Sequence, residues 1–269
     1  MERMRPVKRI YATGISGTIG RHLSGYVLPL DLDLAKPIDR TVIPHDLSIL
    51  IHLAGIVGEI NVVKNIEYAR RVNVLGTLEL AQSLDLETLE RFLYVSTSHV
   101  YTPTERDIAE DATVGPVAEY PKQKLEAEVL LKEYFSSAPE KLLIIRVFSV
   151  LGFDVEDFTL GGLASRIANG SSELVVNSDD IRDFMTPTQI ALGIQKLAET
   201  PKISGTYNLC SGEPLSVSNA LRKHFNLMGV PAENYESQFR RGNSTNPRIV
   251  GDNSKLMQAV PELAKTLWS

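Results

Sequence analysis

The chain has 269 residues, of which 43% are hydrophobic and 23% charged, and its formal net charge is −5. A chain of this length and composition can bury a sizeable core as a globular protein. No run of lysine or arginine predicts a nucleic-acid interface, and no stretch reaches the roughly 18 apolar residues of a membrane span. The single cysteine, Cys210, excludes an internal disulfide and a multi-cysteine metal site. We therefore expect a cytoplasmic protein with no metal, no nucleic-acid partner and no membrane association.

Short apolar segments alternate with longer amphipathic segments along the first 150 residues. The apolar segments predict strands at 7–13, 48–54, 91–95 and 142–147, and the amphipathic ones predict helices at 18–23, 63–84 and 120–135. Strands that alternate with helices and are apolar on both faces predict a parallel sheet covered on both sides.

Shorter elements follow residue 150, with a helix expected at 160–169, a strand at 173–177 and a helix at 187–199. The fold class that we predict is α/β, a Rossmann-type doubly wound parallel sheet. Residues 1–150 would form the dinucleotide-binding domain with the catalytic residues. Residues 151–269 would form a smaller substrate-binding lobe, interwoven with the first domain.

Three glycines, Gly14, Gly17 and Gly20, form a G-x-x-G-x-x-G turn between the first strand and the first helix. Glycine allows a tight bend and a close approach of the backbone to a pyrophosphate, and a helix N-terminus attracts its negative charge. We predict that this turn, with Ser16, Thr18 and Ile19 between the glycines, binds a dinucleotide.

The segment that follows the turn is short for the rest of a dinucleotide-binding unit. Between Gly20 and His52 there is little room for a helix, two strands and their connections. Either Asp31 closes a truncated second strand and binds the adenosine ribose, or Leu30–Asp33 ends the third strand and the second is lost. The choice between NAD and NADP stays open.

Tyr120 and Lys124 lie four residues apart, on one face of the predicted helix. A lysine in that place lowers the pKa of the phenol and makes it a useful acid or base, and it can also bind the nicotinamide ribose. Thr97 follows a predicted strand, at the sheet edge where open α/β sheets bind ligands. These three side chains predict an oxidoreductase site.

At this point the sequence resembles the extended short-chain dehydrogenase/reductase superfamily, in its NAD-dependent epimerase/dehydratase branch. The resemblance runs along nearly the whole chain. Its segments are the turn at 14–20, then 51–55, 73–77, 95–101, Glu110 with Asp111, Tyr120 with Lys124, Arg146 with Gly152, 182–184, 205–213 and 252–255.

The resemblance implies a nucleotide-activated sugar as the substrate and NAD or NADP as the cofactor. It implies that Thr97 hydrogen-bonds the reacting oxygen, that Tyr120 moves its proton and that Lys124 holds the ribose. It further implies two sets of binding residues. Those for the cofactor are Leu53, Ala54 and Gly55, and those for the substrate are Ser98, His99, Ser149, Arg182, Arg240 and Arg241.

Departures from the family pattern narrow the chemistry. Sugar dehydratases carry an Asp-Glu pair where this chain has Ser98 and His99, so dehydration is disfavoured. The resemblance then implies C4-keto reduction or C4 epimerisation. The alternative is an NAD(P)H-dependent reductase of a small carbonyl compound without a nucleotide, such as a natural-product intermediate. Relatives suggest a homodimer through the helices at 63–84 and 120–135.

Overall fold

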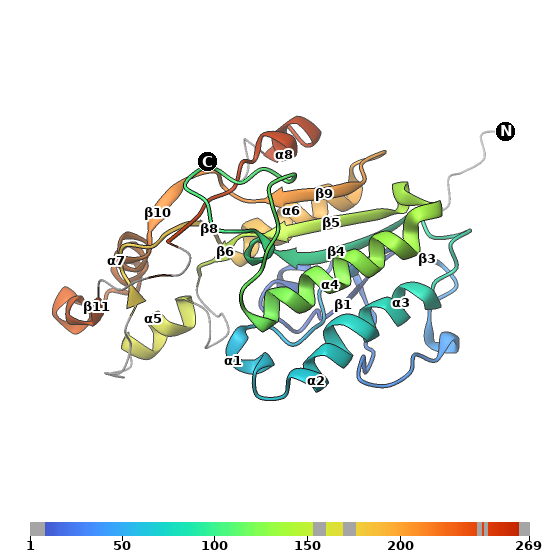
Figure 1. The fold of residues 1–269 in the computed structure, drawn as a ribbon, viewed down its shortest axis with the longest axis horizontal. Coiled ribbons are helices and arrows are strands. Elements are labelled where there is room, and N and C mark those ends of the chain that lie inside the picture. The colour runs from blue at the N-terminus through green and yellow to red at the C-terminus, as the bar shows by residue number, and fades with distance from the viewer. Residues whose placement is uncertain (1–8, 153–159, 169–175, 241–243, 245–246, 264–269) are drawn as a thin grey trace.

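The computed structural model describes residues 9–152, 160–168, 176–240, 244 and 247–263. A parallel sheet of six strands forms its centre, in the order β2-β1-β3-β4-β5-β9 (Figure 1). The strands are β1 (Arg9–Thr13), β2 (Leu28–Pro29), β3 (Leu47–His52), β4 (Arg91–Thr97), β5 (Leu142–Val147) and β9 (Gly205–Leu209). The predicted Rossmann-type fold class is confirmed.

The first face of this sheet is covered by the helices between β3 and β5. They are α2 (Ile66–Arg70), the π-helical segment η3 (Arg71–Gly76), α3 (Thr77–Ser83) and α4 (Glu119–Tyr134). Side chains that alternate along the strands, such as Phe92 and Tyr94 of β4, pack under them in one buried cluster. The predicted helix at 63–84 is thus three helical segments in a row, with a π-helix in the middle.

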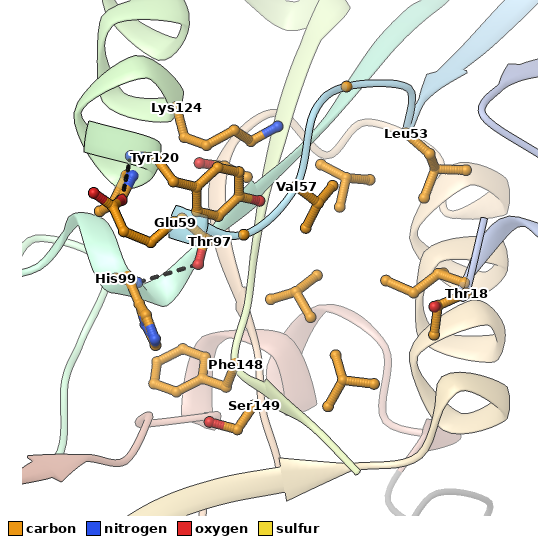
Figure 2. Close-up of a pocket in the computed structure, with 18 of the residues that line it drawn as sticks. Thr18, Leu53, Val57, Glu59, Thr97, His99, Tyr120, Lys124, Phe148 and Ser149 are labelled. Atoms are coloured by element: carbon orange, nitrogen blue, oxygen red, sulfur yellow. Dashed lines mark hydrogen bonds between the residues drawn. The ribbon is translucent and has the colours of Figure 1, made fainter. Parts of the chain in front are cut away.

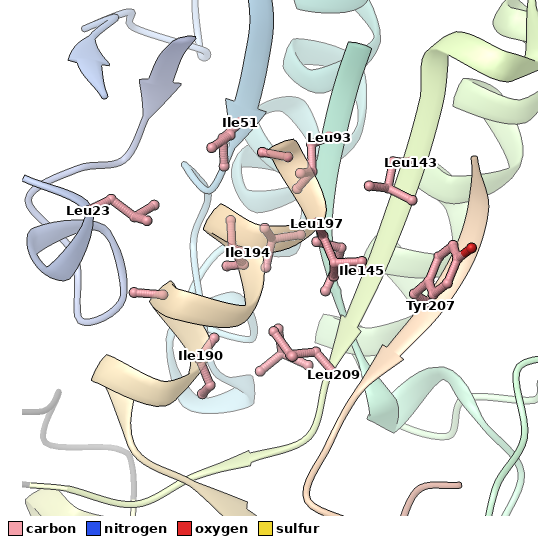
Figure 3. Close-up of a cluster of buried hydrophobic side chains, with 14 of the residues drawn as sticks. Leu23, Ile51, Leu93, Leu143, Ile145, Ile190, Ile194, Leu197, Tyr207 and Leu209 are labelled. Carbon is pink, nitrogen blue, oxygen red and sulfur yellow. The ribbon is translucent and has the colours of Figure 1, made fainter. Parts of the chain in front are cut away.

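The second face is covered by α6 (Pro187–Glu199) and α8 (Ser254–Ala259). Leu93, Leu143 and Ile145 of the strands meet Ile190 and Ile194 of α6 in the other large buried cluster (Figure 3). Each fully buried side chain of this kind stabilises the fold by about 1.5–3 kcal/mol relative to exposure. Apolar residues on both faces of the same strands therefore hold the sheet between two helical layers.

The second strand, β2, is only two residues long and lies at the sheet edge, parallel to β1. Leu30 directly after it still donates its backbone N–H to the Ala12 carbonyl over 2.8 Å. Pro29 has no N–H to donate, so it suits an edge position. Of the two alternatives, the structure contains the truncated second strand, and no further strand lies outside it among the described residues.

The first helix is shorter than predicted. Only Gly20–Leu23 is helical, as the 3-10 segment η1, and the predicted start at Thr18 is wrong. Gly25 follows with a φ of 83°, a left-handed conformation that favours glycine and ends the segment.

A smaller lobe lies beyond the carboxyl ends of the main strands (Figure 1). Its sheet pairs β8 (Ile181–Met185) with β6 (Ser149–Val150), β10 (Pro214–Ser216) and β12 (Arg248–Ile249). Beside it lie α5 (Leu160–Ala168), α7 (Val217–Met228) and the pair β7 (Val176–Asn177) with β11 (Phe239–Arg240). The chain enters this lobe, returns to the main sheet as α6 and β9, and enters it again.

The remaining elements are short. They are α1 (Glu59–Val62) and the 3-10 segments η2 (Arg40–Val42), η4 (Ser98–Val100), η5 (Phe135–Ser137), η6 (Pro139–Lys141), η7 (Ala232–Asn234) and η8 (Glu236–Gln238). The predicted segments at 7–8, 169 and 173–175 lie outside the described residues. None of the described helices has both the length and the apolar character needed to cross a membrane.

Candidate active site

A cavity of about 950 Å³ opens between the carboxyl ends of the main strands and the smaller lobe. Figure 2 shows Thr18 and Leu53 on one side of it and Tyr120, Lys124 and Thr97 on the other. Most of the predicted site residues line this one space: Gly14, Ser16, Gly17, Thr18, Ile19, Gly20, Leu53, Ala54, Gly55, Thr97, His99, Tyr120, Lys124, Ser149 and Arg182.

The glycine turn closes one end of the cavity, and its packing explains the glycines. Gly14 has a φ of 71°, and a Cβ there would lie 2.6 Å from the Ala54 nitrogen, while a Cβ at Gly20 would overlap the Gly14 carbonyl oxygen. A Cβ at Gly17 would meet only that oxygen, at 3.4 Å. The Thr18 hydroxyl is buried and has no hydrogen-bond partner among the described residues. A backbone open at Gly17 beside an unpaired hydroxyl fits the pyrophosphate of a dinucleotide.

His52 ties the strand end beside this turn to the helical layer. Ala54 donates its N–H to the Thr13 hydroxyl, and that hydroxyl lies 2.7 Å from His52 Nδ1. Because the Thr77 hydroxyl donates its hydrogen to the Asn73 carbonyl, a neutral His52 must donate from Nε2 and accept from Thr13 at Nδ1. His52 Nε2 then donates to Thr77 over 2.9 Å, and Thr77 donates to the Asn73 carbonyl. Burial lowers the pKa of His52 to about 3, so the ring stays neutral. The hydrogen bonds from Ala54 through Thr13, His52 and Thr77 to Asn73 then all donate in the same direction.

Asn73 lies in the π-helical segment and supports the wall of the cavity behind Gly55. Its side-chain oxygen accepts the Ile56 N–H over 2.7 Å, and its amide nitrogen donates to the Ile56 carbonyl and to Gln123 of α4. A π-helical turn departs from the regular hydrogen-bond ladder and is frequent at functional sites. Here it places the buried Asn73 amide between Ile56 in the cavity wall and Gln123 of α4.

Tyr120 and Lys124 lie in the first turns of α4, as the sequence predicts. Tyr120 is the second residue of the helix and Lys124 is buried one turn later. Burial raises the pKa of the Tyr120 phenol, and burial lowers the pKa of Lys124 to about 7, although Glu128 opposes that shift. The predicted lowering of the phenol pKa by Lys124 is not found, because both groups are withdrawn from water and the lysine is only partly charged near neutral pH.

Thr97 ends β4 and is the N-cap of η4. Its hydroxyl oxygen accepts the backbone N–H of His99 over 3.3 Å, which leaves the hydroxyl hydrogen available to a molecule in the cavity. A hydroxyl placed in this way can donate to a carbonyl oxygen on the substrate.

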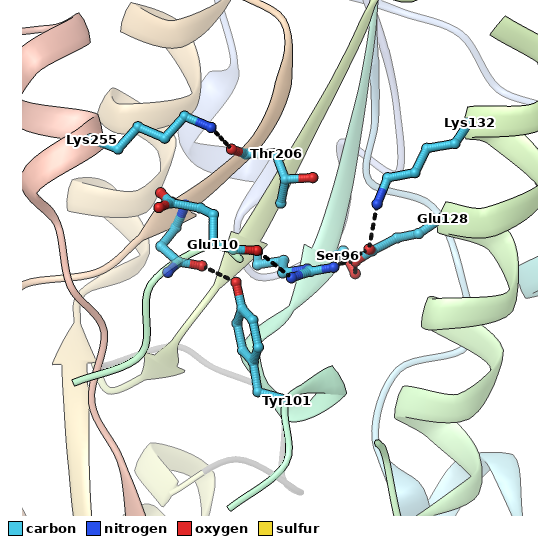
Figure 4. Close-up of polar contacts among 9 residues, drawn as sticks. Ser96, Tyr101, Glu110, Glu128, Lys132, Thr206 and Lys255 are labelled. Atoms are coloured by element: carbon cyan, nitrogen blue, oxygen red, sulfur yellow. Dashed lines mark hydrogen bonds and ion pairs between the residues drawn. The ribbon is translucent and has the colours of Figure 1, made fainter. Parts of the chain in front are cut away.

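A buried ion pair behind these groups connects α4 to the sheet (Figure 4). Glu128 of α4 accepts two bonds from the Arg146 guanidinium of β5, at 2.6 and 3.0 Å, and a third from the Ser96 hydroxyl of β4 at 2.6 Å. The carboxylate is fully buried, so its charge depends on these partners. Ser96 directly precedes Thr97, and the network therefore sets the position of Thr97 relative to Tyr120.

The far end of the cavity is bounded by the smaller lobe. Arg182 of β8 lines it while bonding the Asp180 carboxylate over 2.7 Å. His99 faces the cavity, and its pKa is lowered by the surrounding protein and by the positive charge of Arg182, so it is neutral at pH 7. Ser149 and Phe148 complete this wall (Figure 2).

Two predicted site residues point elsewhere, and two others cannot be placed there. Asp31 is exposed and does not line the cavity, because the chain turns away after the short β2. Ser98 is buried outside the lining, since η4 turns its side chain into the protein. Arg240 lies in β11, paired with Asn177, and Arg241 lies outside the described residues.

Glu59 is a lining residue that sequence reasoning missed. Its carboxylate accepts the backbone N–H groups of Glu119 and Tyr120 at 3.1 and 2.8 Å (Figure 2). The partners lie about sixty positions away in the chain, so no local pattern in the sequence announces them. Asn73 belongs to a segment that was noted as a motif, but its role in joining Ile56 to Gln123 needed the structure.

The sequence model of the NAD dependent epimerase/dehydratase family matches residues 27–210. The chain belongs to this family. The resemblance seen in the sequence is thereby confirmed, and with it the expectation of an NAD(P)-dependent enzyme of the extended short-chain dehydrogenase/reductase type.

Two curated relatives match this chain over about nine tenths of their own length. GDP-6-deoxy-D-mannose reductase from Pseudomonas aeruginosa is 25% identical, over 93% of this chain and 90% of the relative. GDP-6-deoxy-D-talose 4-dehydrogenase from Aggregatibacter actinomycetemcomitans is 24% identical, over 94% of this chain and 91% of the relative.

Solved structures show the same fold. RMD from Pseudomonas aeruginosa, complexed with NADPH, superposes with a TM-score of 0.79 at 24% identity, covering 94% of this chain and 92% of that one. UDP-glucuronic acid 4-epimerase from Bacillus cereus, in complex with UDP-glucuronic acid and NAD, also gives 0.79, at 20% identity over 97% and 96% of the two chains.

Proposed function

We propose that the protein transfers a hydride at C4 of a nucleotide-activated sugar, as a 4-keto reductase or a 4-epimerase, with Tyr120 as the acid/base. The observation that carries this proposal is the continuity of the cavity. The glycine turn, Tyr120 and Arg182 line one space of about 950 Å³. A hydride-transfer enzyme needs its cofactor and substrate in contact, with the acid/base beside them.

Each group in the cavity has a distinct task. A nicotinamide cofactor, when bound, gives or takes the hydride. In the direction of reduction, the carbonyl carbon of the sugar gains the hydride, and the carbonyl oxygen takes the Tyr120 proton, which solvent replaces. Thr97 donates a hydrogen bond to that oxygen, and Lys124 binds the cofactor ribose. Arg182 suits the diphosphate because a guanidinium is a planar, permanently charged donor.

The composition of the lining supports chemistry at one carbon. Glu59 is the only carboxylate among the described lining residues, and both of its oxygens are held by backbone N–H groups of α4. Elimination of water would need a further acid/base pair, so reduction or epimerisation is favoured over dehydration.

Replacing the acid/base tests the reaction. Tyr120→Phe keeps the ring and should lower kcat by about 10²–10⁴-fold, while the Kd for NADH and NADPH, measured by fluorescence titration, stays within twofold. Undiminished turnover by Tyr120→Phe would refute the role of the phenol.

The substrate class is tested at the other end of the cavity. Arg182→Ala should raise KM for GDP- and UDP-sugars by about tenfold or more, because a charge-assisted bond to phosphate contributes about 1.5–3 kcal/mol. An unchanged KM would favour the second candidate, a reductase of small carbonyl compounds without a nucleotide.

Cofactor accounting separates a reductase from an epimerase. A reductase consumes one NAD(P)H for each sugar reduced, whereas an epimerase interconverts its sugars with no net consumption. GDP-linked 4-keto-6-deoxysugars are the first substrates to assay, since both nearly full-length relatives are named for GDP-6-deoxysugars. The same assay with NADH and with NADPH gives the cofactor preference.

We further propose a homodimer formed by the outer faces of α2 and α4. Ile66 and Tyr68 of α2 are 40% and 51% exposed, and Val129 of α4 is 54% exposed. Val129→Asp should convert a dimer to a monomer in sedimentation velocity, and a monomeric parent protein would reject the proposal.

We also propose a cytoplasmic location, which the buried free thiol of Cys210 supports.

A further inference from the structure

The first turn of α4 lacks the usual means of satisfying its backbone donors. Ala118 at the N-cap has no side chain that can accept a hydrogen bond. The backbone N–H groups of Glu119 and Tyr120 have no acceptor within the helix, and Pro121 has no N–H. Two donors therefore need acceptors from elsewhere, and one of them belongs to the acid/base residue itself.

Both donors are taken by one carboxylate from another part of the chain. Glu59 Oε1 accepts from Glu119 at 3.1 Å, and Glu59 Oε2 accepts from Tyr120 at 2.8 Å. Glu59 begins α1, directly after Gly58, whose φ of 85° sets the turn that aims α1 at α4. Figure 1 shows α1 beside the end of α4 at which that helix begins.

The segment that carries Glu59 is also a wall of the cofactor pocket. Leu53, Ala54, Gly55, Ile56, Val57 and Gly58 all line the cavity between β3 and α1. A carboxylate that holds two amides of α4 joins this wall to the helix that carries Tyr120 and Lys124. A helix N-terminus attracts negative charge, which strengthens such a contact.

We infer that Glu59 is a positioning residue that fastens the 53–58 segment to the first turn of α4 and so sets Tyr120 relative to the cofactor. The expected effect of Glu59 on kcat rests on the proposed function, whereas its effect on hydrogen exchange does not. The competing explanation is that Glu59 only caps α4 and does not position the 53–58 segment. A capping residue within α4 itself distinguishes these two roles, because it satisfies a backbone donor of the helix without any contact to that segment.

The experiment compares Glu59→Ala in two backgrounds, the natural chain and Ala118→Ser. A serine at the N-cap can accept the Tyr120 N–H of its own helix, since Pro121 has none, so it restores part of the cap without connecting the 53–58 segment to α4. Glu67→Ala is the matched control, an exposed carboxylate on α2 outside the cavity lining. Readouts are kcat, KM, melting temperature, and hydrogen exchange of the peptide covering residues 53–62 without ligands.

If Glu59 positions the segment, Glu59→Ala lowers kcat by about 10–100-fold in both backgrounds, since a displacement of about 1 Å costs that much. Exchange in residues 53–62 becomes faster in both backgrounds, and Ala118→Ser recovers part of the melting temperature but neither kcat nor the slow exchange. Glu67→Ala leaves kcat within twofold. Glu59→Gln, which keeps one acceptor oxygen, gives an intermediate kcat and also serves if Glu59→Ala folds poorly.

The inference is overturned if the Glu59→Ala effect on kcat and exchange disappears in the Ala118→Ser background, because Glu59 is then only a helix cap. It is also overturned if exchange in residues 53–62 is unchanged by Glu59→Ala. If no nucleotide sugar is turned over by the natural chain, the proposed function fails, while the exchange measurement still decides the role of Glu59.

Discussion

The Lys124 ammonium lies over the face of the Tyr94 ring, 4.2 Å from the ring centroid. The His52 ring is stacked with the same tyrosine, with centroids 5.9 Å apart. The Tyr94 hydroxyl is buried without a hydrogen-bond partner among the described residues. The Tyr94 ring therefore supports the Lys124 ammonium by a cation–π contact. The buried Tyr94 hydroxyl lowers the stability of the fold, because it loses its hydration without gaining a hydrogen bond.

Substitutions at Tyr94 should separate the ring from the hydroxyl. Tyr94→Phe keeps the platform and removes an unpaired polar group, so the free energy of unfolding should rise by about 1 kcal/mol with kcat unchanged. Tyr94→Leu removes a cation–π contact of about 0.5–2 kcal/mol and leaves space beside Lys124, so stability and kcat should both fall. Urea unfolding and steady-state kinetics on both variants check this. A destabilised Tyr94→Phe protein would mean that the hydroxyl is bonded.

Lys124 should make the free energy of unfolding depend on pH. Its pKa is lowered to about 7 in the folded protein from 10.5, so between these values the unfolded chain binds more protons. Stability contributed at this position therefore rises with pH from about 7 to about 10.5, and it is lowest below pH 7. Lys124→Met should be more stable than the natural chain at pH 6 by up to a few kcal/mol, at about 1.4 kcal/mol per pKa unit.

That advantage should shrink as the pH rises to 10, which urea titrations at several pH values can follow. Lys122→Met is the matched control, because Lys122 lies exposed on the same helix. A difference between Lys124→Met and the natural chain that does not change with pH would show that the buried lysine keeps an ordinary pKa.

The ion pair of Glu128 and Arg146 should be costly to break from either side. Glu128→Leu or Arg146→Met leaves a buried charge without its partner, and each should lower the free energy of unfolding by about 3–5 kcal/mol. The double variant Glu128→Leu with Arg146→Met should be more stable than either single variant, since no charge stays buried. Additive losses in this double-mutant cycle would contradict a direct coupling.

Local patterns in the sequence predicted four of the six strands of the central sheet and placed Tyr120, Lys124 and Thr97 at one site. Alternation of apolar segments with helices and the spacing of Tyr120 and Lys124 depend on neighbours in the chain, so they can be read directly. Thr97 followed from its place at a strand end. The four predicted strands reappear with their described ends within two residues of the prediction, and the helix expected at 63–84 begins three residues later, at Ile66.

Long-range partners could not be predicted in this way. Glu59 meets α4 only because two loops converge at the edge of the sheet. Ser98 turns inward because η4 follows Thr97 at once, and Asp31 leaves the site because Pro29 ends a two-residue strand. The place of each of these side chains depends on the direction of the backbone over a few residues. The hydrophobic periodicity of a sequence does not predict that direction.

The His52 relay gives the last prediction. Its pKa is lowered to about 3 in the folded protein from 6.5, so below pH 6.5 the unfolded chain binds the extra proton. The stability that neutral His52 provides is present above pH 6.5 and is lost as the pH falls towards 3. His52→Phe leaves the Thr13 hydroxyl without an acceptor and should cost about 1–3 kcal/mol at pH 7.

Because only the natural chain loses that stability in acid, the gap between it and His52→Phe should narrow between pH 6.5 and 4. Urea unfolding across this range measures the gap, and His45→Phe is the control because His45 is exposed. A gap that stays constant down to pH 4 would mean that His52 takes up its proton in the folded protein as readily as in the unfolded chain. Thr13 could then not donate to Nδ1 in acid, and burial would not be what keeps the ring neutral.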